Sequence, residues 1–248
     1  MRTNKIKVIG VAAALTAAMA IPTGVFADSH EGAMVRVGHF SPDAPAVDIY
    51  ANGAILADLE GVEFGTLSGY IEVPADTYSI AVVVAGEDPA EATVIGPADV
   101  ALEAGSKSTI AATGFVADIA PIILDDSVET EEGMAQVRIV HFSPDAPAVD
   151  VAPDGADALL TDLAFGLDTG YVPLPEGEYD LEVRVAGTDT VAIQLDPITL
   201  DGDTAYSVFA IGSLDGETLT VLPAVDSAAE MGEEMGEEMD EETEENAG

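Results

Sequence analysis

The stretch His39-Phe-Ser-Pro-Asp-Ala-Pro-Ala-Val-Asp48 occurs a second time, without any change, from His141 to Asp150. The residues that precede the two copies are also alike, Val35-Arg36-Val37 and Val137-Arg138-Ile139. Both matches have the same offset of 102 residues, and later landmarks keep their order at slightly smaller offsets. A repeat of roughly 100 residues has the size of an independent domain. The sequence therefore predicts two copies of one domain.

Composition and repeat together divide most of the chain into a first domain over 33–125, a linker over 126–133, a second domain over 134–225 and a tail over 226–248. The linker is short and acidic and ends in Gly133, which is typical of a joint that allows relative motion. The tail consists mainly of Glu, Met and Gly, and this acidic composition predicts disorder. A helical tail is the alternative, because Glu and Met favour helices, but the run of like charges opposes it.

The first 27 residues have the pattern of a signal peptide. Three basic residues precede an apolar stretch from Val8 to Met19, and Val25-Phe26-Ala27 places small residues where a signal peptidase cleaves. Retention of this stretch as a membrane anchor is the alternative, although Pro22 and Gly24 interrupt it. We therefore expect a secreted or cell-surface protein, with no membrane span after cleavage.

The charge balance restricts the partners. All 47 acidic residues but only four of the seven basic residues follow Ala27, so the expected mature chain has a net charge of −43. Such a chain is repelled by nucleic acids and by anionic lipids, and both are excluded as partners. The charge suits a saline habitat without requiring one. The absence of cysteine excludes disulfides, zinc thiolates and thiol nucleophiles.

Residues on both sides of the repeated stretch alternate between apolar and polar, as in half-buried strands. Val35, Val37 and His39 share one face, so we expect the His39 ring, and the matching ring of the second copy, to point into the domain interior. Asn52-Gly53 and the matching Asp154-Gly155 are preferred pairs for a type I′ hairpin turn. Both domains therefore begin with the pattern of paired strands.

A second hairpin is expected between residues 69–73 and 77–85, around Pro74-Ala75-Asp76. With further apolar segments, each domain has about seven short strands between Gly and Pro turns, which predicts an all-β fold of two tandem antiparallel β-sandwich domains. Tyr78 and Tyr179 alternate with apolar residues after a turn. We expect them to be core tyrosines whose hydroxyls bond to backbone, rather than platforms on which sugars stack.

The segment from Val35 to Asp48, followed by a short strand and an Asn-Gly or Asp-Gly turn, resembles the opening of domain-of-unknown-function family 4397. The resemblance occurs once per domain and covers nearly all of the chain between leader and tail. It implies exported or surface-associated bacterial and archaeal proteins with immunoglobulin-like sandwiches, often in tandem. It implies no activity, and no catalytic residue can be transferred from it.

Polar side chains of the repeated stretch, which we name the repeated corner, are the candidate site residues: His39, Ser41, Asp43 and Asp48, with His141, Ser143, Asp145 and Asp150. Its prolines fix φ and hold the preceding residues extended, and an Asp beside them often bonds nearby backbone amides. The favoured interpretation is a stiff structural corner whose Ser, Asp or carbonyl groups satisfy the histidine ring. A ligand site is the alternative, because the same polar groups recur with their surroundings.

Catalytic constellations are poorly represented. Three histidines follow Ala27, and the two in the domains belong to different domains; Gly-x-Ser-x-Gly, phosphate-loop and dinucleotide motifs are missing. We expect no catalytic residue, no metal site and no cofactor. A calcium site at pairs such as Asp201-Gly-Asp203 is an alternative, but no loop has the spaced ligands that end in Glu. Weak association of divalent cations with the tail is expected instead.

Export, tandem duplication and the missing catalytic set indicate a non-enzymatic envelope or extracellular protein, a spacer or interaction module for an unknown partner. The alternative is a carbohydrate-binding or small polar ligand-binding protein with one equivalent site per domain. The absence of tryptophan disfavours this alternative, since sugar sites usually offer exposed aromatic faces. A hydrolase with His39 and Asp48 in a pocket is the third hypothesis, and a filled sandwich interior would count against it.

Overall fold

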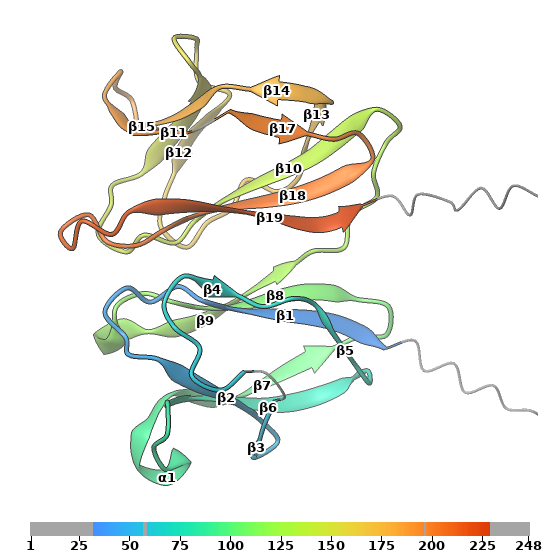
Figure 1. The fold of residues 1–248 in the computed structure, drawn as a ribbon, viewed down its shortest axis with the longest axis vertical. Helices are drawn as coiled ribbons and strands as arrows, with labels where there is room; N and C mark the ends of the chain where they lie inside the picture. The colour runs from blue at the N-terminus through green and yellow to red at the C-terminus, as the bar shows by residue number, and fades with distance from the viewer. Residues whose placement is uncertain (1–31, 57–58, 196, 229–248) are drawn as a thin grey trace, which may run out of the picture.

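The computed structural model describes residues 32–56, 59–195 and 197–228. This part is all-β and sandwich-like, with two β-rich units stacked along the long axis (Figure 1). The expected signal peptide and most of the expected tail lie outside the described residues. Among the described residues, no helix has the length and apolarity needed to cross a membrane.

The first unit has nine strands: β1 (Ala33–His39), β2 (Val47–Ala51), β3 (Ala54–Ile55), β4 (Thr66–Leu67), β5 (Ile71–Val73), β6 (Asp76–Val84), β7 (Thr93–Leu102), β8 (Lys107–Thr113) and β9 (Ala120–Asp125). One sheet has the order β4-β1-β8-β9, with β5 also beside β1, and the other has the order β3-β2-β6-β7. The helical turn α1 (Pro89–Ala92) begins at Asp88, whose side chain accepts from the amide of Ala90.

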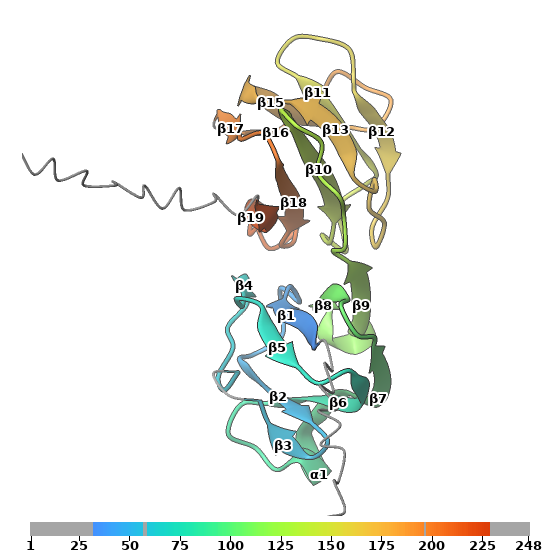
Figure 2. The ribbon, with the colours of Figure 1, turned by 90° about the vertical axis from the view of Figure 1, so that its right-hand side faces the viewer.

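The second unit repeats this plan with β10 (Met134–His141), β11 (Val149–Pro153), β12 (Leu160–Leu163), β13 (Val172–Pro175), β14 (Gly177–Tyr179), β15 (Leu181–Val185), β16 (Val191–Gln194), β17 (Ile198–Leu200), β18 (Thr204–Ile211) and β19 (Thr220–Ala228). Its sheets have the orders β13-β10-β18-β19 and β12-β11-β15-β16, and β14 pairs with β17. The sheet that contains β10, β18 and β19 faces the sheet of β1, β8 and β9 (Figures 1 and 2).

The expectation of fully antiparallel sandwiches is wrong for one pair of strands in each unit. β1 runs parallel to β8, from Met34 opposite Lys107 to His39 opposite Ala112. β10 runs parallel to β18 in the same way. The other strand pairs described are antiparallel. Periodicity shows which face of a strand is buried, but it contains no information on the direction of the neighbouring strand.

Two turn predictions also need correction. Asn52 and Gly53 both have positive φ between paired β2 and β3, as a type I′ turn requires. In the second unit only Gly155 of the matching pair has positive φ, and the Ala156 amide donates to Pro153 O, which is a type II pattern. The second expected hairpin does not form, because β5 pairs with β1 whereas β6 pairs with β2 and β7 in the other sheet.

Three apolar regions hold the described residues together. Each sandwich has its own interior, and the first includes Val35 and Val37 of β1, which face inward as the alternation predicts. The third region lies between the units and contains buried side chains from both: Phe40, Ala111, Leu124, Val140, Phe142, Phe209 and Ile211. The outer face of β1 is thus buried as well as its inner face.

The expected boundaries of linker and tail change accordingly. Asp126, the first residue of the expected linker, is fully buried and its amide donates to Lys107 O, so it continues the edge of the first unit. Asp226, the first residue of the expected tail, is fully buried within β19, which ends at Ala228. Both corrections have one cause, because these aspartates belong to contacts between the two units.

Candidate functional site

The histidines of the repeated corner are buried and hydrogen-bonded to backbone. Nε2 of His39 lies 3.1 Å from Pro45 O, and Nε2 of His141 lies 3.1 Å from Pro147 O. A carbonyl oxygen only accepts, so Nε2 must carry the proton. In the second copy the Ser143 amide donates to Nδ1 of His141 (3.2 Å). Burial lowers the pKa of both histidines, although the bond to the carbonyl opposes the shift, and both rings are neutral at pH 7.

Asp48 and Asp150 tie loops to the start of β2 and β11. Asp48 accepts from the amides of Gly61 (2.7 Å) and Gly86 (2.9 Å), one on each carboxylate oxygen. Asp150 accepts from the amides of Asp162 (2.8 Å) and Gly187 (2.9 Å) in the same manner. These two amide bonds lower the pKa of Asp150. The carboxylates therefore serve backbone groups that would otherwise lack acceptors.

Asp43 and Asp145 bond to a different loop, not to the histidines. Asp43 accepts from the Val116 amide (2.8 Å). Asp145 accepts from the hydroxyl of Ser213 (2.7 Å) and from the amides of Leu214 (2.8 Å) and Asp215 (2.9 Å). Burial opposes ionisation of Asp145, but these bonds outweigh it and lower its pKa. Both aspartates hold the connection between the last two strands of their unit.

Ser41 and Ser143 are buried, and within the described residues their hydroxyls have no hydrogen-bond partner. Ser143 and His141 line a cavity of about 100 Å³ whose other walls are mostly apolar. For comparison, an apolar cavity of about 150 Å³ holds a molecule of the size of benzene. The space is thus too small for a sugar, and the repeated corner has the hydrogen bonds of a structural element.

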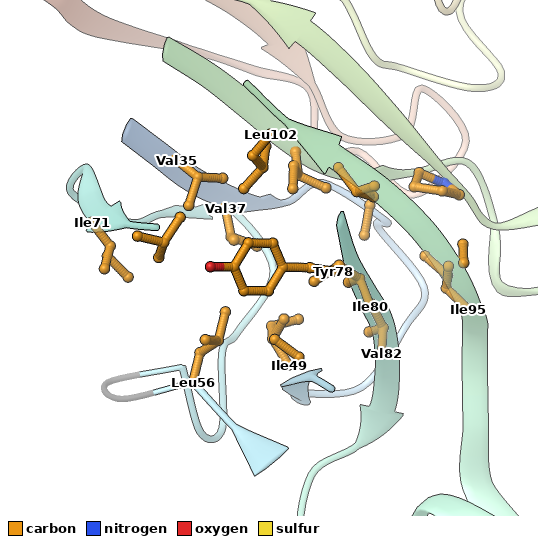
Figure 3. A pocket seen from close by; sticks show the side chains of 17 residues that line it. Val35, Val37, Ile49, Leu56, Ile71, Tyr78, Ile80, Val82, Ile95 and Leu102 are labelled. Atoms are coloured by element: carbon orange, nitrogen blue, oxygen red, sulfur yellow. The ribbon is translucent and has the colours of Figure 1, made fainter. Parts of the chain in front are cut away.

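The sandwich interiors are nearly filled. The first contains a cavity of about 40 Å³ and the second one of about 30 Å³, both with apolar walls. Figure 3 shows the Tyr78 ring among Ile49, Leu56 and Val37 in the first interior. The hydroxyl of Tyr78 donates to Pro74 O (2.8 Å), and that of Tyr179 donates to Pro175 O (2.8 Å), as expected for core tyrosines.

A polar hollow of about 620 Å³ lies in the second unit, between loop residues 155–157, Asp189 and strand β15. On β15, Glu182 and Arg184 form an ion pair, in which Arg184 Nε donates to Glu182 Oε1 (2.7 Å). The strand registers place Ala81 and Val83 of the first unit at the matching positions. Sequence reasoning missed this hollow; the signal was a pair of charges on a strand whose counterpart is apolar.

A cluster of buried polar side chains lies between the two units, and the sequence analysis does not predict it. Arg36 Nη2 donates to Asp226 of the other unit, Nη1 to Val225 O (3.2 Å) and Nε to Thr109 Oγ1 (2.7 Å). Arg36 and the three groups that accept its hydrogen bonds lie at the contact between the units. The Arg36 and Asp226 side chains are 3% and 0% exposed, so this ion pair is withdrawn from water.

Arg138 repeats these contacts in the opposite direction. Its Nη2 donates to Asp126 of the first unit (2.5 Å), Nη1 to Asp125 O (2.8 Å) and Nε to Ser207 Oγ (3.1 Å). Burial disfavours the charge on Arg138, but the hydrogen bond to Asp126 and the electrostatic effects of Tyr171, Asp126 and Asp226 together outweigh burial and raise its pKa. The units are therefore joined by two buried arginine–aspartate pairs related by a pseudo-two-fold axis.

Each aspartate is held by its own unit. Asp126 accepts from Tyr70 (2.8 Å) and Thr109 (2.5 Å), and Asp226 accepts from Tyr171 (2.7 Å) and Ser207 (2.6 Å). Burial raises the pKa of both tyrosines, and the adjacent aspartates raise it further, so the hydroxyls remain donors. Arg36 and Arg138 lie over the rings of Tyr70 and Tyr171, each 4.7 Å from the centroid.

The basic residues are concentrated at this contact. Only Arg36, Lys107, Arg138 and Arg184 follow Ala27. The first three lie between the units, where the Lys107 ammonium donates to Asp226 O. Within the described residues, no group of three or more His, Asp or Glu side chains is arranged to hold a metal.

Three solved structures are similar to this chain at a low level. A carbohydrate-binding module of Eubacterium rectale in complex with maltoheptaose is 11% identical over 76% of this chain and 96% of its own, with a TM-score of 0.24. A streptococcal virulence factor described for α-glucan binding is 11% identical over 75% and 95%, with a TM-score of 0.22. A proposed cell adhesion protein of Bacteroides fragilis is 9% identical over 81% and 99%, with a TM-score of 0.21. Scores this low do not establish a shared fold.

A comparison with curated proteins finds none with significant sequence similarity. The model of the family described as Domain of unknown function (DUF4397) matches twice, over residues 33–152 and 135–235. The two matches begin close to the start of β1 and of β10, and together they span most of the chain. The chain therefore belongs to the DUF4397 family and carries its domain in tandem.

Proposed function

We propose that this protein is an exported, non-enzymatic module of the cell envelope or extracellular space, in which two immunoglobulin-like domains form one stiff spacer. The supporting observation is the double Arg–Asp contact between the domains. Breaking one buried pair leaves an uncompensated charge and costs about 3–5 kcal/mol. Bending at this joint would break both pairs and expose the phenylalanines between the domains. The joint is thereby held in one arrangement.

The hydrogen bonds that the aspartates and the histidine Nε2 atoms of the repeated corner make to backbone groups support a structural role for the motif, while Nδ1 of His39 and the two serine hydroxyls have no partner within the described residues. Its four aspartates accept from backbone amides, and its histidines bond to backbone carbonyls. A general base needs a free nitrogen within reach of a substrate, whereas these rings are 1% exposed. The same groups give the domain stiff loops, which suits a module that presents a surface at a fixed distance.

The stiffness can be measured directly because the chain has no cysteine. Glu87→Cys and Glu178→Cys place one spin label on an exposed position of each domain. We expect pulsed dipolar spectroscopy to give one narrow distance distribution in the mature chain. Arg36→Ala with Arg138→Ala should broaden it, whereas Arg184→Met, which removes a cation outside the contact, should not. A broad distribution in the unaltered chain would contradict the proposal.

A second candidate function is binding of a small polar ligand by the second domain alone. The hollow beside Glu182 and Arg184 has the volume of a small-molecule site and offers both charges. Because the matching positions of the first domain are Ala81 and Val83, the proposal is one site per chain rather than one per domain. Calorimetric titration with soluble oligosaccharides, on the unaltered chain and on Arg184→Met, tests it; no heat with either chain would reject it for sugars.

A further inference from the structure

We propose that four apolar positions make the contact between the domains heterotypic, so that domain 1 accepts domain 2 and rejects a second copy of itself. The positions are Gly38 and Ala111 in domain 1, and Val140 and Phe209 in domain 2. They are equivalent pairs, because Gly38 pairs with Ala111 between β1 and β8, and Val140 pairs with Phe209 between β10 and β18. This inference rests on the stiff pairing proposed above.

The charged groups at the contact cannot provide this selectivity. Each domain offers one arginine and one aspartate at matching places, Arg36 with Asp126 and Arg138 with Asp226. A surface with both partners related by a two-fold axis is self-complementary. Two copies of domain 1 could therefore form the same Arg–Asp pairs as domain 1 forms with domain 2. Discrimination must come from groups that differ between the domains.

The apolar centre differs in size. Domain 1 has no side-chain carbon at position 38 and one at 111, whereas domain 2 has Val140 and Phe209, both fully buried. Phe209 fills the space on the domain 1 side, where its ring lies 5.2 Å from Phe40. It also lies 6.0 Å from Phe142 of its own domain. One large side chain thus occupies the centre, and only one of the two domains supplies it.

The two rings of the repeated corner show that the symmetry is broken locally. A Cβ at Gly38 would lie 2.6 Å from the Phe40 ring, so this ring lies directly over the glycine. Phe142 cannot take the same place relative to its strand, because Val140 occupies that position. Two copies of domain 2 would bring two Phe209 rings to the centre and overpack it, whereas two copies of domain 1 would leave a cavity there.

Polar contacts at the edge add to the asymmetry. Lys107 of domain 1 donates to Asp226 O of domain 2 and lies over the Tyr70 ring, 4.1 Å from its centroid. The matching residue of domain 2 is Ala205, opposite Gln136 in the strand register. This hydrogen bond therefore exists in one direction only. Two copies of domain 2 would lack it, whereas two copies of domain 1 would both carry Lys107, so rejection of a second domain 1 rests on the apolar centre.

A size-swap experiment tests the inference in the full mature chain with the spin labels described above. Ala111→Phe should overfill the centre and Phe209→Ala should empty it, so each single variant should broaden the distance distribution. The double variant returns one large ring to the other side of the pseudo-two-fold axis and should narrow the distribution again. Position 111 faces the contact while Ile110 and Ala112 face the sandwich interior, so each domain should keep its own fold.

Ala111→Leu provides a milder enlargement if Ala111→Phe does not fold. We expect it to broaden the distribution less than Phe does, and Phe209→Ala to rescue it in part. Narrow distributions in both single variants, or a double variant as broad as the singles, would overturn the size-based selectivity and leave the stiff pairing intact. A broad distribution in the unaltered chain would instead remove the proposed function itself, so the two failures are distinguishable.

Discussion

Replacement of Arg36 by Met should destabilise the protein much more than replacement of Lys107 by Met, although both remove one positive charge from the same contact. Arg36→Met keeps much of the side-chain volume but leaves Asp226 buried without its nearest cation. Lys107 donates to a backbone carbonyl, so its removal leaves no buried carboxylate unpaired. The comparison therefore isolates the ion pair from the general effect of charge.

The magnitude follows from the groups left behind. Breaking a buried ion pair by removing one partner costs about 3–5 kcal/mol. Asp226 would retain Tyr171 and Ser207 as donors, and Arg138 remains 3.9 Å away, which places the cost of Arg36→Met near the lower end, about 3 kcal/mol. Lys107→Met should cost about 1.5 kcal/mol, the lower end of the range for one hydrogen bond with a charged group.

Urea unfolding followed by circular dichroism measures both values. With a slope of about 2 kcal/mol per M, a loss of about 3 kcal/mol lowers the midpoint by about 1.5 M. Asp226→Asn in the Arg36→Met background should recover part of the loss, because the buried charge is then gone. If Arg36→Met costs no more than Lys107→Met, the Arg–Asp pair does not hold the domains together and the reasoning fails.

Three further predictions concern the histidines, the end of the chain and the corner aspartates. Burial lowers the folded-state pKa of His39 and His141, so the unfolded chain binds more protons below about pH 6.5. The free energy of unfolding should therefore be highest above about pH 6.5 and fall below it by up to ~1.4 kcal/mol per pH unit for each histidine. His39→Gln should reduce this slope, and a free energy of unfolding that does not change with pH would exclude it. Truncation after Ala228 should leave the thermal midpoint unchanged, whereas truncation after Val225 removes Asp226 and should lower it by several degrees; equal midpoints for the two chains would show that Asp226 is dispensable. Asp48→Ala should cost about 1–3 kcal/mol and speed hydrogen exchange at the amides of Gly61 and Gly86, and unchanged exchange there would mean that the carboxylate does not hold these loops.

The inner faces of the strands could be predicted from the sequence because burial follows local alternation. Val35 and Val37 line the interior of the first sandwich as that pattern requires. Strand partners could not be predicted in the same way. β5 and β6 are separated by two residues and still belong to different sheets, while β1 pairs with β8, about 70 residues later. Alternation of apolar and polar residues shows which face of a strand is buried, and turn residues show where the chain reverses. Neither shows which strand pairs with which in a sheet.

The contact between the domains left a signal in the sequence that a reading of one domain at a time could not interpret. Arg36 of β1 and Phe40, directly after β1, lie on the side opposite Val35 and Val37, which an isolated domain would expose to water. A phenylalanine and an arginine recur at that face in the second copy, although only four basic residues follow Ala27 in a chain of high negative charge. An exposed charged residue can change its position in the sequence at little cost, whereas a residue of a buried ion pair cannot. Scarce basic residues at matched positions of a duplicated domain therefore indicate that the two copies meet there. The aspartates that pair with these arginines, Asp126 and Asp226, fall in the predicted linker and tail because acidity alone does not distinguish a solvated carboxylate from one buried against an arginine.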